Sequence, residues 1–182
     1  MVSFKSSLAA FVAALGIGST ASAAVVTISQ TFYNTSSSTR RFSFTQYMQG
    51  VGIGAGSVQM IGSLTITLTD MNGNGARIAT SGSDPIYRAT VDGVTVKTLN
   101  ASPWVWQWST PFDSRSTVPI NYSEALPPGV NPAGTLGLAT TFDLSAGDAA
   151  YVSATFEVIP APAPAALIAI AGLVGSRRRR RG

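Results

Sequence analysis

The chain contains neither cysteine nor histidine, and only 11% of its 182 residues are charged. These absences exclude disulfides, a thiol nucleophile, a histidine base, catalytic triads and the usual zinc and copper sites. A pair of carboxylates could still cleave a glycosidic bond, since eight acidic residues remain. Stability must therefore come from a hydrophobic core, no cofactor is expected, and a glycosidase is the enzymatic alternative left open.

Basic residues are scarce between the two chain ends. Lys5 and the arginines at 177–181 make up six of the 12 basic residues, which leaves six against eight acids, a net charge of −2. A nucleic-acid-binding surface needs clustered positive charge. The composition therefore predicts that nucleic acid is not a partner.

The N-terminal residues 1–23 have the features of a secretory signal peptide. Lys5 precedes a short apolar stretch, and the segment ends with small residues at Ala21 and Ala23. Signal peptidase requires small side chains at these two places, so we expect cleavage before Ala24. An N-terminal membrane anchor, the alternative, would need a longer apolar run.

The C-terminal residues 159–182 contain a proline-rich stretch, an apolar run over 165–175 and a block of arginines. A helix over that run would reach only about 16 Å, against about 30 Å for the hydrocarbon core of a bilayer. We expect a short transmembrane helix whose C-terminus stays in the cytoplasm, because a block of arginines does not cross a membrane. The predicted membrane stop consists of Arg177, Arg178, Arg179, Arg180 and Arg181.

This order of prolines, short apolar helix and arginines resembles the PEP-CTERM sorting signal of Gram-negative bacteria, over about the last 24 residues. The Pro-Glu-Pro motif of that family corresponds to Pro160, Ala161 and Pro162, so the acidic middle residue is absent here. The resemblance implies export, transient retention in the inner membrane, processing by an exosortase-type enzyme, and delivery to the cell surface or outside the cell. Such proteins often occur in species that make exopolysaccharide. A plain C-terminal membrane anchor is the alternative.

Residues 24–158 show the period of two that is typical of β-strands, interrupted by turn residues. The clearest segment is 64–69, where leucine and isoleucine alternate with three threonines, and 151–158 repeats the pattern. Further strands are predicted at 25–33 and 42–47. No segment keeps a helical period, so we expect a single antiparallel β-sandwich, either jelly-roll or immunoglobulin-like.

Two hairpins are predicted in this domain. Asp92-Gly93 suits a two-residue type I′ turn between 86–91 and 94–99. The resulting register pairs Val91 with Val94 and Ala89 with Val96, and it places Arg88 opposite Lys97. The second predicted hairpin joins 136–144 to 151–158.

Two other segments are predicted to be irregular. Residues 111–134 are rich in proline and predict a long surface connection. Glycine occupies every second position of 50–56, and this pattern predicts a loop without a phosphate-binding role, because no helix follows it.

Three tryptophans, Trp104, Trp106 and Trp108, alternate along one predicted strand and therefore share one face. Burial in the core is the favoured interpretation, because large aromatic side chains are mostly buried. If the face is exposed, the indoles would instead form a platform for stacking on sugar rings.

The run from Asp70 to Gly75 matches the first half of a calcium-binding loop, but Ser81 stands where the bidentate glutamate belongs. The sequence favours ordinary turn chemistry there, and no metal site is expected.

Taken together, these features predict a non-enzymatic surface or extracellular-matrix protein whose partners are signal peptidase, an exosortase-type enzyme and, transiently, the inner membrane. The alternative is a carbohydrate-binding module that recognises extracellular polysaccharide with the tryptophan stripe. A glycosidase is the third hypothesis.

Overall fold

The computed structural model describes residues 23–50 and 58–160, which form eleven β-strands and no helix. No helix long and apolar enough to cross a membrane is found in these ranges. The predicted sorting residues Ala161, Pro162 and 177–181 lie outside them, as do Ala21 and nearly all of the glycine-rich loop. The strands are β1 (Ala24–Tyr33), β2 (Arg40–Met48), β3 (Val58–Asp70), β4 (Ala76–Ala79), β5 (Tyr87–Val91), β6 (Val94–Leu99), β7 (Val105–Trp108), β8 (Ser114–Ser116), β9 (Ile120–Ala125), β10 (Leu136–Leu144) and β11 (Asp148–Pro160).

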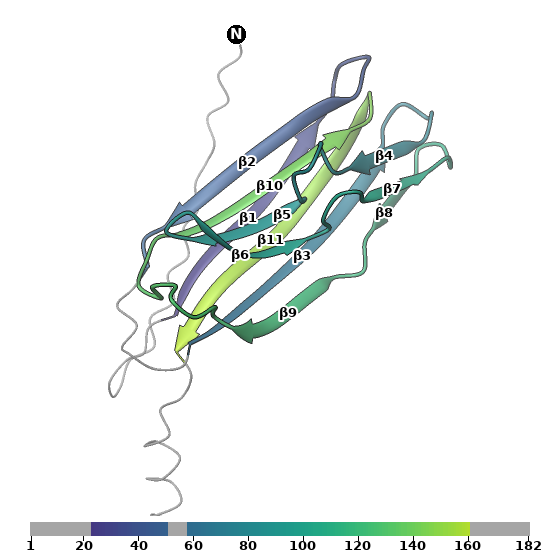
Figure 1. The fold of residues 1–182 in the computed structure, drawn as a ribbon. Coiled ribbons are helices and arrows are strands. Elements are labelled where there is room, and N and C mark those ends of the chain that lie inside the picture. Colours follow the sequence, from purple (N-terminus) through teal and green to yellow (C-terminus); the bar gives the residue numbers. More distant parts are fainter. Residues whose placement is uncertain (1–22, 51–57, 161–182) are drawn as a thin grey trace, which may run out of the picture.

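The strands form two antiparallel sheets, which confirms the prediction of an all-β antiparallel fold (Figure 1). Sheet A has the order β1-β11-β3, with β8 and β9 both beside β3. In sheet B, β10 pairs along its whole length with β2, and along its other edge first with β5 and then with β4. One edge of sheet B is β2, and the other edge consists of β6, beside β5, and β7, beside β4.

The core lies between the sheets because each strand alternates buried and solvent-facing side chains. In β3 the odd-numbered threonines face outward, while Leu64, Ile66 and Leu68 are at most 1% exposed. Sheet B contributes inward residues such as Phe142 and Leu144, both fully buried. The two apolar faces thus exclude water from a single core, as the alternation predicted.

The sandwich has a proximal and a distal end, which differ in the strands that begin or stop there. At the proximal end β1 begins and β11 ends, since Ala24 pairs with Val158 and Pro160 pairs with Val58. At the distal end β3 stops at Asp70, and the chain returns from there into sheet B. The first strand of the domain therefore begins, and its last strand ends, at the proximal end of the sandwich (Figure 1).

The predicted hairpin between 136–144 and 151–158 is wrong. Both strands exist, but β10 belongs to sheet B and β11 to sheet A, and they do not pair with each other. The buried Asn34 holds the crossover between them, because its side-chain amide donates to the carbonyls of Leu144 and Ser145, each at 2.9 Å. A short turn can therefore join two sheets as well as two neighbouring strands.

The hairpin at Asp92-Gly93 is confirmed, with positive φ at both residues, but its predicted register is only half right. Val91 pairs with Val94 as expected. A bulge after Ala89 then shifts the ladder, so that Ala89 faces Lys97 instead of Val96. Arg88 consequently lies opposite a threonine, and the predicted like-charge pair does not form.

The predicted surface connection over 111–134 is also partly wrong, because it contains β8 and β9. These short strands extend sheet A beside β3, where β9 pairs with residues 59–64 and β8 with residues 67–69. The strands predicted at 25–33 and 42–47 are confirmed as β1 and β2. β11 is longer than predicted and reaches Pro160.

Candidate functional site

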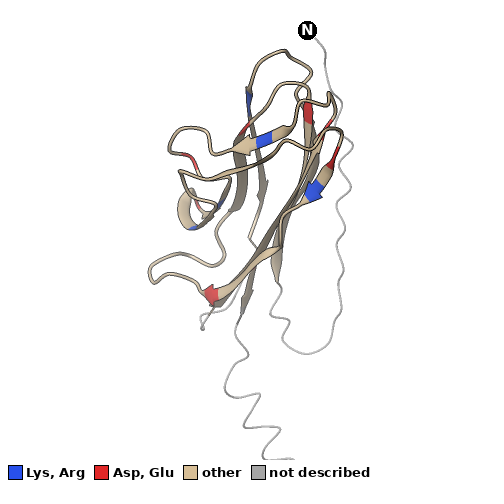
Figure 2. Cartoon of the chain, turned by 90° about the vertical axis from the view of Figure 1, so that its right-hand side faces the viewer, with Lys and Arg blue, Asp and Glu red and all other residues tan. Residues whose placement is uncertain are grey.

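Charged residues are scattered along the strands and loops drawn in Figure 2, and the Lys and Arg segments do not gather into one continuous stretch. Most of the acids have structural partners. Asp84 binds Arg41 and Arg88, the latter at 2.7 Å, and Lys97 forms an ion pair with Glu124. Among the described residues, no group of three acids could hold a metal ion.

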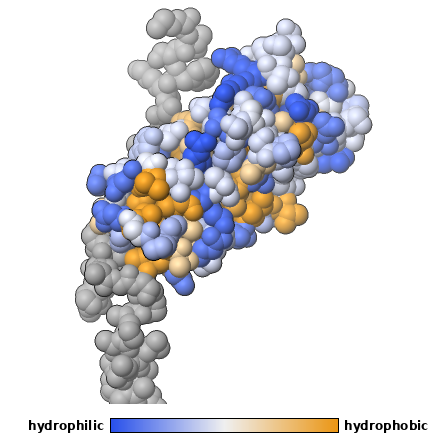
Figure 3. Space-filling view, viewed as in Figure 1, coloured by the Kyte–Doolittle hydropathy of each residue, from blue (hydrophilic) through white to orange (hydrophobic). Residues whose placement is uncertain are grey.

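Apolar side chains on the face seen in Figure 3 form separate patches among hydrophilic atoms. The tryptophans belong to the edge of the core: Trp104, Trp106 and Trp108 are partly buried and pack against it. Trp106 pairs with the fully buried Ile78, so Trp106 and Trp108 share the inward side of β7, and Trp104 lies just before that strand. Their outward neighbours are exposed, and the stripe is not presented as an open platform.

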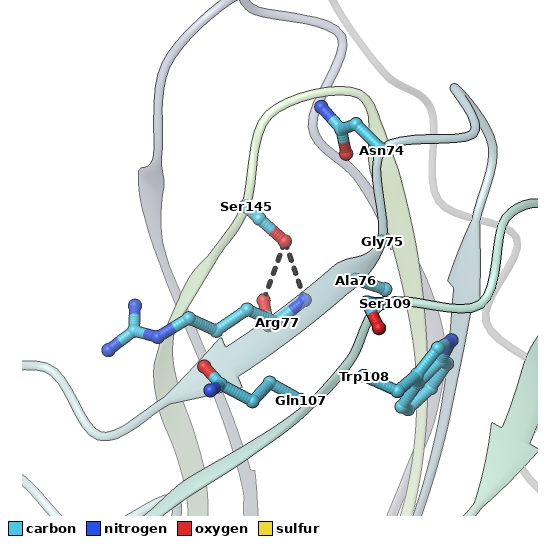
Figure 4. Close-up of a pocket in the computed structure, with 8 residues that line it drawn as sticks. All are labelled: Asn74, Gly75, Ala76, Arg77, Gln107, Trp108, Ser109 and Ser145. Atoms are coloured by element: carbon cyan, nitrogen blue, oxygen red, sulfur yellow. Dashed lines mark hydrogen bonds between the residues drawn. The ribbon is translucent and has the colours of Figure 1, made fainter.

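A hollow with a volume of about 500 Å³ lies at the distal end, between the start of β4 and the end of β7 (Figure 4). The ring of Trp108 lines it, and the Arg115 guanidinium lies 5.3 Å from the centroid of that ring. Arg77 is the one ionisable residue in its lining, so the hollow holds no acid–base pair. Its lining thus combines one basic side chain with amide and hydroxyl groups.

Asp70 organises the corner that the calcium-loop match had singled out. Its carboxylate is 2% exposed and accepts four backbone N–H groups, from Asn72, Gly73, Gly75 and Phe112, at 2.8–3.1 Å. Burial opposes the charge, but these four donors outweigh it and hold the pKa of Asp70 below its usual value. Both oxygens are thus used by the turn, in agreement with the favoured turn interpretation.

A second buried carboxylate, Asp148, is the register partner of Asp70 in sheet A. It is 1% exposed, and its Oδ1 has no hydrogen-bond partner among the described residues. Burial raises the pKa of Asp148, and the neighbouring charge of Asp70 raises it further, while a hydrogen bond with the Ser145 hydroxyl partly offsets both effects. The distal corner therefore holds one stabilised carboxylate and one destabilised carboxylate.

The Ser145 hydroxyl joins this corner to the hollow. It accepts from the Arg77 N–H at 2.7 Å, and its oxygen lies 2.9 Å from the Arg77 carbonyl (Figure 4). Its third partner is Asp148 Oδ2. A hydroxyl has only one proton to donate, so a protonated Asp148 would satisfy all three contacts at once.

Two tyrosines connect the sheets through the core. The hydroxyl of Tyr87, on sheet B, lies 2.7 Å from that of Tyr122, on sheet A, and donates to the Thr155 carbonyl at 2.9 Å. Burial raises the pKa of both phenols, that of Tyr122 to about 12. The ring of Tyr122 also covers Gly62, where a Cβ would lie 2.5 Å from ring atoms. This pair is structural, because it is enclosed by the sandwich.

No family model, curated protein or solved structure matches the chain.

Of the predicted sorting residues, the structure describes three. Ala23 precedes β1, Ala24 is its first residue and is 2% exposed, and Pro160 is the last residue of β11. One feature escaped the sequence reasoning: Tyr33 and Tyr151 lie exposed on the outer face of sheet A. The alternation in each strand showed that these positions face outward, but not that the two strands are neighbours.

Proposed function

We propose that this chain is an exported, non-enzymatic cell-surface or extracellular-matrix protein, sorted through a PEP-CTERM-like C-terminal tail. The observation that carries the proposal is the continuity of β11 with the sorting motif. β11 remains paired with β3 up to Pro160, the first residue of that motif. The last strand of the folded domain would then lead directly into the predicted tail.

The position of the two chain ends supports this arrangement. Cleavage before Ala24 would make the first residue of β1 the new N-terminus, beside Val158 at the proximal end. The distal end would point away from the membrane, and both outer sheet faces would stay open to the surroundings. Such an orientation suits a domain that contacts extracellular material.

The strand order supports the jelly-roll alternative over the immunoglobulin-like one. β4 with β5, β6 with β7, and β8 with β9 each occupy one strand position, so the eleven strands fill eight positions. Counted along the chain, the first position pairs with the eighth, the second with the seventh, the third with the sixth and the fourth with the fifth. A long hairpin rolled into two sheets, as in a jelly roll, produces this order.

The roles of the acids argue against the glycosidase alternative. Glycoside hydrolysis needs two carboxyl groups that face one another across a substrate cleft. The two buried carboxyls, Asp70 and Asp148, instead hold the chain at a corner, and Asp84 and Glu124 are bound to basic residues.

Replacing the five arginines at 177–181 with serine should strongly reduce retention in the membrane. The short apolar run would lose the charges that stop it in the bilayer, where an arginine costs about 2.5–3.5 kcal/mol. We expect the membrane-bound precursor, measured by fractionation and immunoblotting of the producing bacterium, to fall roughly tenfold.

Five lysines in place of the arginines are the matched control, because they keep the charge and should behave as wild type. Unchanged fractionation and processing of the serine variant would refute the sorting proposal.

A further inference from the structure

The outer face of sheet A is a continuous array of hydroxyl groups, which we call the hydroxyl face. Outward-facing serines and threonines of β1, β11, β3 and β8 form it in register. Ser29 lies beside Ser153, which lies beside Thr65. In the next row Thr31, Tyr151, Thr67 and Ser116 follow one another across the four strands. Neighbouring strands are about 4.8 Å apart, and successive outward residues about 6.8 Å apart, so the array is regular in both directions.

Hydrogen bonds between strands fix the orientation of these hydroxyls. Ser29 bonds the Tyr151 hydroxyl at 2.7 Å, and Thr67 bonds Ser116 at 2.7 Å. Thr69 with Ser114, and Ser63 with Thr155, are paired at 2.8 Å. Each such pair uses one of its two protons, so the other proton and several lone pairs are available to a molecule on the surface.

Two tyrosines add apolar area to this polar array. Tyr33 is 57% exposed and Tyr151 is 40% exposed. Tyr33 pairs with Ala149, two residues before Tyr151, so the two residues are diagonal neighbours across the β1–β11 pair, with backbone positions about 7–8 Å apart. They lie in the distal half of the face, away from the end where the predicted tail begins.

The hydroxyl face has almost no charge. Among the outward residues of its strands, only Glu157 is ionised, and it lies near the proximal end of β11. The outer face of sheet B differs, since it carries Arg41, Arg88 and Asp143. A charged ligand would therefore find no counter-charge on the hydroxyl face.

We propose that the hydroxyl face binds an uncharged polysaccharide, with Tyr33 and Tyr151 stacking on sugar rings and the ordered hydroxyls exchanging hydrogen bonds with sugar hydroxyls. The inference rests on the proposed extracellular location and names the partner there. Rigid aromatic rings beside directed donors and acceptors match the two kinds of surface that a sugar presents. A protein partner fits less well, because the cores of protein interfaces are depleted in serine.

The test is retention of the mature protein on immobilised neutral polysaccharides (dextran, β-1,3-glucan and galactomannan), with alginate as the anionic comparison. We expect retention on at least one neutral polymer and none on alginate at moderate salt. Replacing Tyr33 and Tyr151 together with alanine should weaken retention by roughly tenfold or more. Both side chains lie on the solvent-facing side of sheet A and are at least 40% exposed, so the variant should remain folded, as circular dichroism would show.

Tyr47→Ala is the matched control, because Tyr47 is 68% exposed on the outer face of sheet B. It should leave retention unchanged. Absence of retention on every neutral polymer would overturn the proposal, as would equal retention of the double variant. Loss of retention in Trp106→Ala alone would also overturn it and would move the site to β7. Export and tail processing are read separately from the mass of the mature chain, so failure here would not contradict the sorting proposal.

Discussion

Replacing Asp70 with alanine is expected to lower the midpoint of thermal unfolding by roughly 10 °C at neutral pH. The carboxylate accepts four backbone N–H groups in a nearly water-free corner, and alanine would leave those donors without their partner. Replacing Asp148 with asparagine should have the opposite effect and raise the midpoint by a few degrees. Its charge is buried beside Asp70, and an amide can still bond with the Ser145 hydroxyl.

The two aspartates should also differ in pH dependence. The lowered pKa of Asp70 provides stability that is present above its unfolded-state value, about 3.9, and lost as pH falls through the folded-state value. The raised pKa of Asp148 works the other way: its contribution is present below about 3.9 and lost as pH rises through the folded-state value. The advantage of Asp148→Asn should therefore grow between pH 4 and pH 7.5.

Thermal unfolding followed by circular dichroism at several pH values measures both effects. Asp84→Ala is the control, because Asp84 forms only surface ion pairs, and its midpoint should stay within about 2 °C of wild type. Destabilisation by Asp148→Asn across the whole pH range would contradict our account of the distal corner.

Replacing Tyr87 with alanine should destabilise the domain by about 3–5 kcal/mol, because a fully buried aromatic ring is removed from the centre of the core. Tyr87→Phe keeps the ring and removes only the hydroxyl, which should cost about 1–3 kcal/mol, since Tyr122 and the Thr155 carbonyl lose their partner.

A double-mutant cycle with Tyr122→Phe isolates the bond between the two sheets. Urea unfolding should give a coupling energy of about 0.5 kcal/mol or more between the two hydroxyls. Additive effects of the two phenylalanine substitutions would show that the tyrosines do not act together.

The sequence predicted most of the strands, because the alternation of apolar and polar residues within a strand shows which of its side chains face the core. In segment 64–69 the alternation alone predicts that Leu64, Ile66 and Leu68 face the core, without knowledge of the neighbouring strands. The Asp92-Gly93 turn is equally local, since two positive φ angles suit only a few residue types.

Errors arose where the structure depends on contacts between distant segments. A short turn after Leu144 suggested a hairpin, but the side chain of Asn34, far earlier in the chain, holds the crossover between sheets. The bulge after Ala89 and the pairing of β8 and β9 with β3 likewise leave no strong local signal.

The same limit applies to the candidate surfaces. The tryptophans attracted attention because they alternate within one short segment, yet their inward side is set by pairing with β4. Tyr33 and Tyr151 become neighbours only because the first and last strands of the domain pair along their whole length. Individual patterns could predict outward positions, but the array exists only in the folded sheet.

Intact mass spectrometry of the protein recovered from the surface or medium of the producing bacterium tests the central claim most directly. We predict a chain that begins at Ala24 and has lost the apolar tail with its arginines. A recovered protein that still carries residues 1–23, or that keeps Arg177–Arg181, would contradict the proposal of export followed by tail processing.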